Sequence, residues 1–169
     1  MKKILIFGAL LLMLVGFGSC DDEMVIYDYT PICLKVTVQD KNGNNLLDSL
    51  NTNNILGKQM TITINGKTNE ISLKTPQDLI PPSRAILPIW YGAFVMSGEN
   101  YWWNSSIEPS ICIGEFDGAL NGKEEVELNI DGEKHVISFK NQVNKSNVKR
   151  SFYLDGKEVK DRGNFTIVI

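Results

Sequence analysis

The sequence predicts an all-β protein, an antiparallel β-sandwich of about eight or nine strands. Three observations lead to this prediction. Many short segments alternate apolar with polar residues, or are rich in β-branched and aromatic residues, as is typical of strands with one buried face. Asn-Gly and Asp-Gly pairs, which suit tight hairpin turns, separate several of these segments. No segment has the apolar spacing of an amphipathic helix, so a second sheet must cover the buried face of the first.

The expected strands follow one another from residue 32 to the last residue of the chain. Each carries period-two alternation or an enrichment in residues that favour strands. They are Ile32–Gln39, Gln59–Asn65, Asn69–Lys74, Ala85–Met96, Ile111–Phe116, Glu124–Ile130, Lys134–Lys140, Val148–Leu154 and Phe165–Ile169.

The clearest local feature is a hairpin around Asp131-Gly132, a pair that suits the two positive φ angles of a type I′ turn. Counting outward from this turn places Leu128 opposite His135 and Val126 opposite Ile137 on one face. We expect that face to lie in the core and the alternate residues to face solvent.

Two further pairs, Asn65-Gly66 and Asp155-Gly156, predict hairpins of the same kind. The second hairpin would place Phe152 opposite Val159. Antiparallel neighbours should therefore dominate the sheets.

Residues 35–47, followed by residues 58–65, resemble the opening of transthyretin-like and carboxypeptidase-regulatory-like modules. In those modules a first strand ends in an Asp/Asn/Gly turn, and a second strand follows a short loop. The likeness covers about thirty residues and implies a transthyretin-like or immunoglobulin-like sandwich without implying an activity. The Cys…Trp…Cys spacing of antibody-type domains is not present, because Trp90 lies far from the place it would need.

The N-terminus has the pattern of a secretory signal. Lys2 and Lys3 precede a short apolar run, Ile4–Val15, and small residues lead into Cys20. The run is shorter than the roughly 20 apolar residues that a membrane-spanning helix needs. Phe17–Cys20 resembles the lipobox of bacterial lipoproteins, which implies removal of residues 1–19 and acylation of Cys20.

The acidic residues Asp21, Asp22 and Glu23 resemble the surface-export signal of Bacteroidetes lipoproteins. The resemblance implies a lipid-anchored protein on the outer face of the outer membrane, with a periplasm-facing location as the alternative. We expect residues 20–31 to form a lipidated N-terminal tether and residues 32–169 to form a single sandwich domain.

The charge of the mature chain excludes some partners. After removal of Lys2 and Lys3, 15 basic residues remain against 20 acidic residues, a net charge of −5. Nucleic-acid binding would need clustered basic residues on one face, so we do not expect it. We expect membrane association to come from the lipid on Cys20 rather than from a basic surface.

Cys33 and Cys112 are the other two cysteines. An exported compartment permits a disulfide between them, and two unpaired thiols are the alternative. The chain has no CxxC motif or Cys/His cluster, so no zinc or thioredoxin-like site is expected.

An aromatic group is the sharpest candidate ligand site. It comprises Trp90, Tyr91, Tyr101, Trp102 and Trp103. Aromatic faces with nearby polar side chains are what carbohydrate binding uses, whereas buried Trp and Tyr are also ordinary core residues. Trp102 and Trp103 are adjacent, so in a strand they point to opposite faces and one leaves the core.

Other motifs indicate structure rather than chemistry. Asp40–Asn44 sets oxygen side chains at alternate positions as a calcium loop does, but it lacks the glycine and glutamate of an EF-hand at their required places. A strand-ending turn explains its composition, so no metal is expected. The single histidine, His135, has no nucleophile motif to serve, and Glu125 and Glu127 lie two residues apart on one exposed strand face.

Asp48-Ser49-Leu50 resembles the O-glycosylation site of exported Bacteroidetes proteins, with Ser49 as the acceptor. Together these observations predict a non-enzymatic binding or assembly module without a cofactor. A carbohydrate-binding accessory protein that uses the aromatic group is one alternative. A fimbrial or envelope assembly component that adds strands at its sheet edges is another.

Overall fold

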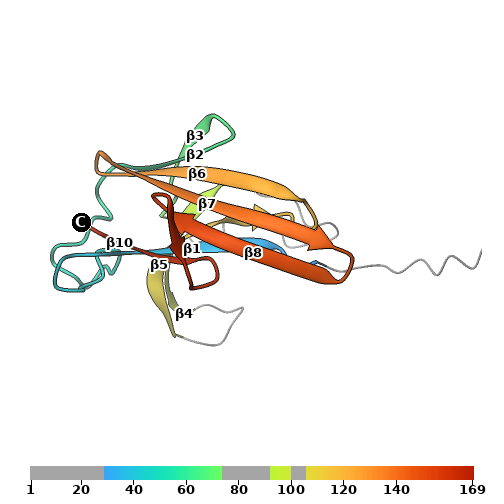
Figure 1. Cartoon of the computed structure of the whole chain (residues 1–169). Helices are drawn as coiled ribbons and strands as arrows, with labels where there is room; N and C mark the ends of the chain where they lie inside the picture. The colour runs from blue at the N-terminus through green and yellow to red at the C-terminus, as the bar shows by residue number, and fades with distance from the viewer. Residues whose placement is uncertain (1–28, 74–91, 100–105) are drawn as a thin grey trace, which may run out of the picture.

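The computed structural model describes residues 29–73, 92–99 and 106–169 (Figure 1). Every element of regular secondary structure in these ranges is a β-strand, which confirms the predicted all-β fold. They are β1 (Ile32–Gln39), β2 (Met60–Ile64), β3 (Lys67–Glu70), β4 (Ala93–Glu99), β5 (Ser106–Phe116), β6 (Gly122–Ile130), β7 (Glu133–Asn144), β8 (Asn147–Leu154), β9 (Lys157–Val159) and β10 (Asn164–Val168).

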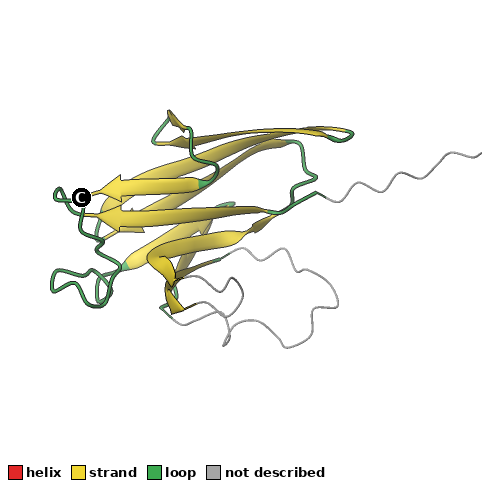
Figure 2. Ribbon diagram, turned by 90° about the horizontal axis from the view of Figure 1, so that it is seen from below, coloured by secondary structure: helices red, strands yellow, loops and turns green. Residues whose placement is uncertain are grey.

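The strands form two sheets that pack as a sandwich (Figure 2). One sheet has four strands in the order β10-β1-β5-β4, and the other has six in the order β3-β2-β6-β7-β8-β9. Neighbouring strands are antiparallel except for β1 and β10, which run parallel. The parallel pair brings together two strands from opposite ends of the domain sequence.

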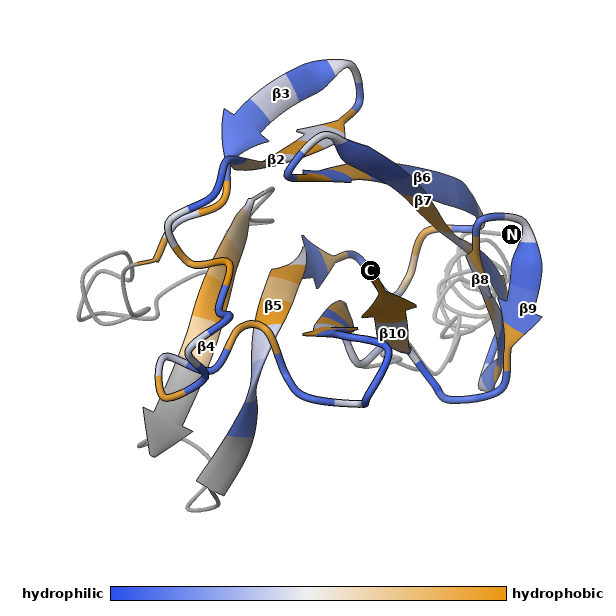
Figure 3. Ribbon diagram, turned by 90° about the vertical axis from the view of Figure 1, so that its left-hand side faces the viewer, coloured by the Kyte–Doolittle hydropathy of each residue, from blue (hydrophilic) through white to orange (hydrophobic). Residues whose placement is uncertain are grey.

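The hydrophobic core lies between the sheets, and it takes buried residues from both of them. Figure 3 shows hydrophobic residues interspersed with hydrophilic ones along the strands. In β1, the burial pattern alternates so that Leu34, Val36 and Val38 are fully enclosed. Residues Ile111 and Val126 contribute in the same way from β5 and β6. Full burial of each such side chain stabilises the fold by about 1.5 to 3 kcal/mol, and the alternation explains why one face of each strand is apolar.

A row of phenylalanine rings crosses the core from one sheet to the other. The centroids of Phe116 and Phe139 are 5.0 Å apart, those of Phe139 and Phe152 are 6.2 Å apart, and those of Phe152 and Phe165 are 6.4 Å apart. The first and third of these contacts are edge-to-face, and such contacts add to the free energy of burial. The row therefore ties β5 and β10 of one sheet to β7 and β8 of the other.

The hairpin registers predicted from the turns are confirmed. Leu128 pairs with His135 and Val126 with Ile137 across the Asp131-Gly132 turn. Phe152 pairs with Val159 across the Asp155-Gly156 turn, in a short strand that the pattern of alternation had not revealed.

The turn residues have the backbone conformation that these hairpins need. Asp131 and Gly132 have φ values of 50° and 92°, and Asn65 and Gly66 have φ values of 51° and 74°. Both residues of each pair thus have positive φ, as a type I′ turn requires.

The predicted strand Asn69–Lys74 is wrong in extent. The tight turn at Asn65-Gly66 makes β3 restart at Lys67, and β3 ends at Glu70. The next residues cross to the other sheet, where the N–H of Ser72 donates to the carbonyl of Ala93 at 3.1 Å. Ser72 forms a parallel bridge with Phe94, so the apolar alternation here belongs to a crossing segment.

Several other strands differ from their predicted bounds. β4 begins at Ala93 among the described residues, and the predicted residues 85–91 lie outside them. β5 starts earlier, at Ser106, and β7 runs on to Asn144 through polar residues that conceal its alternation.

The last residues of the expected tether belong to the folded domain. The carbonyl of Thr30 accepts a hydrogen bond from Nη2 of Arg150 at 2.7 Å, and the hydroxyl of Tyr29 donates to the carbonyl of Lys145 at 2.7 Å. Residues 1–28, including the expected signal segment, lie outside the described residues. Within the described ranges, no helix is long and apolar enough to cross a membrane.

Candidate functional site

The predicted lipidation, export and aromatic sites lie outside the described residues. This applies to Cys20, Asp21, Asp22, Glu23, Trp90, Tyr91, Tyr101, Trp102 and Trp103. The described candidates are Ser49, the two cysteines, residues Asp40–Asn44 (the Asp40 loop), His135 and the glutamates of β6.

Ser49 lies exposed in a turn that its neighbours hold. Oδ1 of Asp48 accepts the N–H of Leu50 at 2.9 Å, and the carbonyl of Asp48 accepts the N–H of Asn51 at 3.0 Å. Leu50 is 89% exposed. The turn therefore presents the Ser49 hydroxyl to solvent, which is the setting that a modifying enzyme needs.

Cys33 and Cys112 are free thiols on adjacent strands of the four-stranded sheet. Cys112 pairs with Lys35, whereas Cys33 lies where β5 has one extra residue and the register shifts. Burial raises the pKa of the Cys112 thiol to about 11, and burial followed by the charge of Glu115 raises that of Cys33. Neither thiol is activated as a nucleophile or metal ligand would be.

The Asp40 loop directs its oxygens inward. Oδ1 of Asp40 accepts the N–H groups of Asn42 and Asn44 at 2.8 and 2.9 Å, and Oδ2 accepts Nδ2 of Asn44 at 2.8 Å. These hydrogen bonds from Asn44 and Asn42 lower the pKa of Asp40. Among the described residues, no group of three or more His, Cys, Asp or Glu could hold a metal ion.

His135 and the β6 glutamates occupy structural positions. Nδ1 of His135 lies 3.0 Å from Oδ2 of Asp155, and its buried Nε2 has no partner among the described residues. Glu125 and Glu127 lie on the outer face of the six-stranded sheet, in ion pairs with Lys123 and Lys134. These pairs neutralise an exposed face rather than flanking a cleft.

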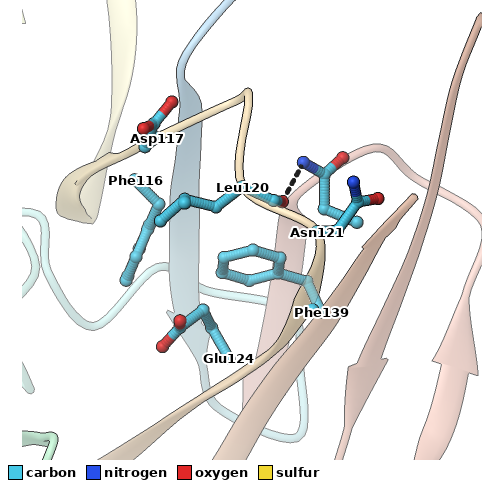
Figure 4. Close-up of a pocket in the computed structure, with 8 residues that line it drawn as sticks. Phe116, Asp117, Leu120, Asn121, Glu124 and Phe139 are labelled. Atoms are coloured by element: carbon cyan, nitrogen blue, oxygen red, sulfur yellow. Dashed lines mark hydrogen bonds between the residues drawn. The ribbon is translucent and has the colours of Figure 1, made fainter. Parts of the chain in front are cut away.

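A small cavity lies beside the core, and the side chains that line it leave little space inside. Phe116, Leu120 and Phe139 surround it, and it encloses about 20 Å³ (Figure 4). Nδ2 of Asn141 donates to the carbonyl of Leu120 at 2.8 Å at its rim. A space of this size holds about one water molecule, so it is not a ligand pocket.

The open edge of β10 is the feature that sequence reasoning missed. Among the described strands, β10 pairs only with β1, and bonds of 2.8 Å from Lys35 N to Gly163 O and of 3.0 Å from Ile169 N to Gln39 O bracket the pair. Because backbone groups alternate along a strand, residues 163, 165, 167 and 169 face β1. The N–H and C=O groups of Thr166 and Val168 point away from it, towards the unpaired side.

A groove of about 550 Å³ runs beside this edge. Thr166 and Phe165 of β10 line it together with the partly buried apolar side chains of Leu154 and Val159. Lys35, Thr37, Glu108, Asp161 and Asn164 complete its lining. The edge thus offers backbone partners next to a groove of mixed polar and apolar lining.

The other sheet edges in the described part of the chain are protected. β3 carries exposed Lys67 and Glu70, and β9 is three residues long with exposed Lys157 and Glu158. The edge of β4 is covered at its start by the bonds to Ser72, including Val95 N to Ser72 O at 2.8 Å. Charge, shortness and cover are ordinary ways of blocking an edge, and β10 has none of them over its five uncharged residues.

No protein-family model matches the sequence, and no curated protein or solved structure matches it either. Function is therefore inferred from the geometry of the described residues. The signal for the β10 edge was present in the uncharged run Asn164–Ile169, but only the sheet order shows that this run is an edge.

Proposed function

We propose that this protein is a lipid-anchored lipoprotein of the bacterial cell envelope whose sandwich binds a partner protein by strand addition. It is an assembly or binding module and not an enzyme. The observation that carries the proposal is the open, uncharged edge of β10 beside a groove lined by both polar and apolar side chains.

Strand addition uses the groups that this edge presents. An extended partner segment hydrogen-bonds to the backbone of Thr166 and Val168, and its alternate side chains enter the groove near Leu154 and Val159. Val168 is 57% exposed, so an apolar partner side chain gains contact with it. The backbone bonds provide affinity, and the polar and apolar side chains that line the groove contact the alternate side chains of the segment and select among segments.

The anchor follows from the N-terminal pattern. The resemblance of Phe17–Cys20 to a lipobox supports acylation of Cys20, and Asp21–Glu23 supports export to the outer surface. A short anchor holds the module close to the membrane, where its partners would be other envelope proteins.

Site-directed photo-crosslinking in the native cell tests the binding edge. A photoreactive phenylalanine analogue at position 166 is expected to form an adduct with a discrete partner, and the same analogue at Lys67 on the β3 edge is the matched control. Val168→Lys places a charge on the edge and should abolish the adduct. No adduct at position 166, or an adduct that Val168→Lys leaves unchanged, contradicts the proposed binding edge.

Protease treatment of intact cells tests the location. Cleavage of the native protein, with protection of a variant in which Asp21, Asp22 and Glu23 are all alanine, is expected if the acidic residues direct surface export. Protection of both forms would favour the periplasm-facing location, with lysed cells as the control for cleavage.

A further inference from the structure

One end of the domain is basic, although the net charge of the chain is negative. Residues 140–150, the distal half of the β7–β8 hairpin, contain Lys140, Lys145, Lys149 and Arg150 and no acidic residue. We call these eleven residues the basic hairpin tip. The tip carries four positive charges, whereas the mature chain as a whole carries a net charge of −5.

The lysines of the basic hairpin tip are available to a ligand. Lys140, Lys145 and Lys149 are exposed, and within the described residues they form no salt bridge. Lys123 and Lys134 on the same sheet differ, because they are paired with glutamates. Val148, between these charges, is 41% exposed and adds apolar surface at the tip.

The chain leaves the domain towards its N-terminus at this tip. The hydroxyl of Tyr29 donates to the carbonyl of Lys145 in the turn itself, and Arg150 donates to the carbonyl of Thr30. Figure 1 shows the β7–β8 turn and the start of the described chain at one end of the molecule, with the C-terminus at the other. Eight residues lie between Cys20 and Tyr29, so these two residues are at most about 30 Å apart.

We propose that the basic hairpin tip is a membrane-contact surface that binds the anionic headgroups of the bilayer holding the lipid on Cys20. This inference rests on the anchor of the proposed function. The anchor brings the tip to the membrane, and the lysines then orient the domain so that the tip faces the headgroups. The net negative charge of the domain is repelled by an anionic surface. The tip lies closest to that surface, however, and the repulsion from acidic residues farther away is screened over a Debye length of about 8 Å.

Energy transfer in reconstituted vesicles tests this orientation. The full acylated protein carries a donor dye at Ser146→Cys in the tip, or at Asn42→Cys at the opposite end, in a Cys33→Ser background. Vesicles of phosphatidylcholine, with or without phosphatidylglycerol, carry an acceptor on their headgroups. Transfer from position 146 should exceed transfer from position 42, rise with phosphatidylglycerol and fall at high salt.

Charge variants identify the groups responsible. Lys145→Gln with Lys149→Gln should weaken docking of the tip by about 25-fold, since each lysine near an anionic surface contributes about a fivefold change in the equilibrium. Lys41→Gln with Lys157→Gln makes the same change in net charge away from the tip and should have no effect. Equal transfer from positions 146 and 42, or transfer that phosphatidylglycerol does not alter, overturns the proposal.

Flotation of the protein with vesicles separates this inference from the proposed function. Failure of the protein to float with neutral vesicles would contradict the proposed lipid anchor. In that case flotation with phosphatidylglycerol vesicles alone would still support the basic hairpin tip, and flotation with neither kind of vesicle would overturn both.

Discussion

His135 and Asp155 join the start of β7 to the turn that follows β8, with Nδ1 of His135 lying 3.0 Å from Oδ2 of Asp155. Oδ1 of Asp155 accepts the N–H of Val136 at 2.7 Å, and the N–H of Asp155 donates to the carbonyl of Val136 at 2.8 Å. These bonds extend the β7–β8 ladder beyond its last register pair, Ile137 with Leu154. One carboxylate therefore ends a strand pair and shapes a type I′ turn.

This link predicts a pH dependence of stability. Burial opposes ionisation of Asp155, but hydrogen bonds from His135 and Val136 and the charges of His135 and Lys157 outweigh it, so its pKa is lowered. A carboxyl with a lowered folded pKa contributes stability above its unfolded pKa of about 3.9 and loses it as pH falls through the folded value.

We expect Asp155→Asn, which retains a residue suited to the turn, to lower the free energy of unfolding at neutral pH by about 0.5 to 1 kcal/mol, because the side chain is half exposed. Urea denaturation from neutral pH down to about pH 2 should show this difference disappearing. A difference that stays constant with pH would mean that charge is not its cause.

Gly118→Ala should release the N-terminal segment from the domain. A Cβ at position 118 would lie 2.2 Å from the carbonyl oxygen of Thr30 and 2.9 Å from Nη2 of Arg150. Backbone must move to accommodate it, at a cost of about 1 to 3 kcal/mol. Denaturation, with limited proteolysis near Tyr29, measures both effects. Gly57→Ala is the control, since nothing lies within 4 Å of its added Cβ.

Asn141→Ala should destabilise the folded domain more than the loss of a polar side chain usually does. Nδ2 of Asn141 donates to the carbonyls of Gly118 and Leu120 at 2.9 and 2.8 Å, and Oδ1 accepts Nε of Arg150 at 3.2 Å. Its removal leaves these groups without their partner, which costs about 2 to 3 kcal/mol in the free energy of unfolding. The exposed Asn144→Ala should cost far less, and similar losses for both variants would contradict this role.

Proline substitutions test the register of the β10 edge. The N–H of Thr166 points away from β1, so Thr166→Pro should change the free energy of unfolding by less than about 1 kcal/mol. The N–H of Ile167 points towards β1, and Ile167→Pro should cost about 2 kcal/mol more because it removes a ladder bond from a buried residue. Equal effects in thermal unfolding would mean that the assigned edge is not open.

Alkylation rates should distinguish the two cysteines. Cys33 is exposed, whereas Cys112 is half-buried with a pKa of about 11, so its reactive thiolate is scarce at neutral pH. Maleimide should label Cys33 first, as mass spectrometry of digested protein would show. Unfolding should equalise the two rates, and failure of both to react until a reductant is added would indicate a disulfide instead.

The hairpins could be predicted from the sequence because their geometry is local. A two-residue turn sets the register of the residues on either side, so Asp131-Gly132 predicts the pairing of Leu128 with His135 correctly. The turn at Lys145-Ser146 escaped prediction, because lysine seldom takes the positive φ of 51° that it has here. Alternation also failed at Ile71, where the chain leaves one sheet for the other.

The sequence by itself determined the all-β class, most strand positions, three hairpins and the position of the acidic and basic residues along the chain. Only the tertiary structure decided that β10 lies parallel to β1 as an edge, and that the basic hairpin tip lies beside Thr30. Hairpins depend on residues a few positions apart. The place of β10 depends instead on pairs such as Lys35 with Asn164, more than a hundred positions apart, which form only when both sheets bury their apolar faces together.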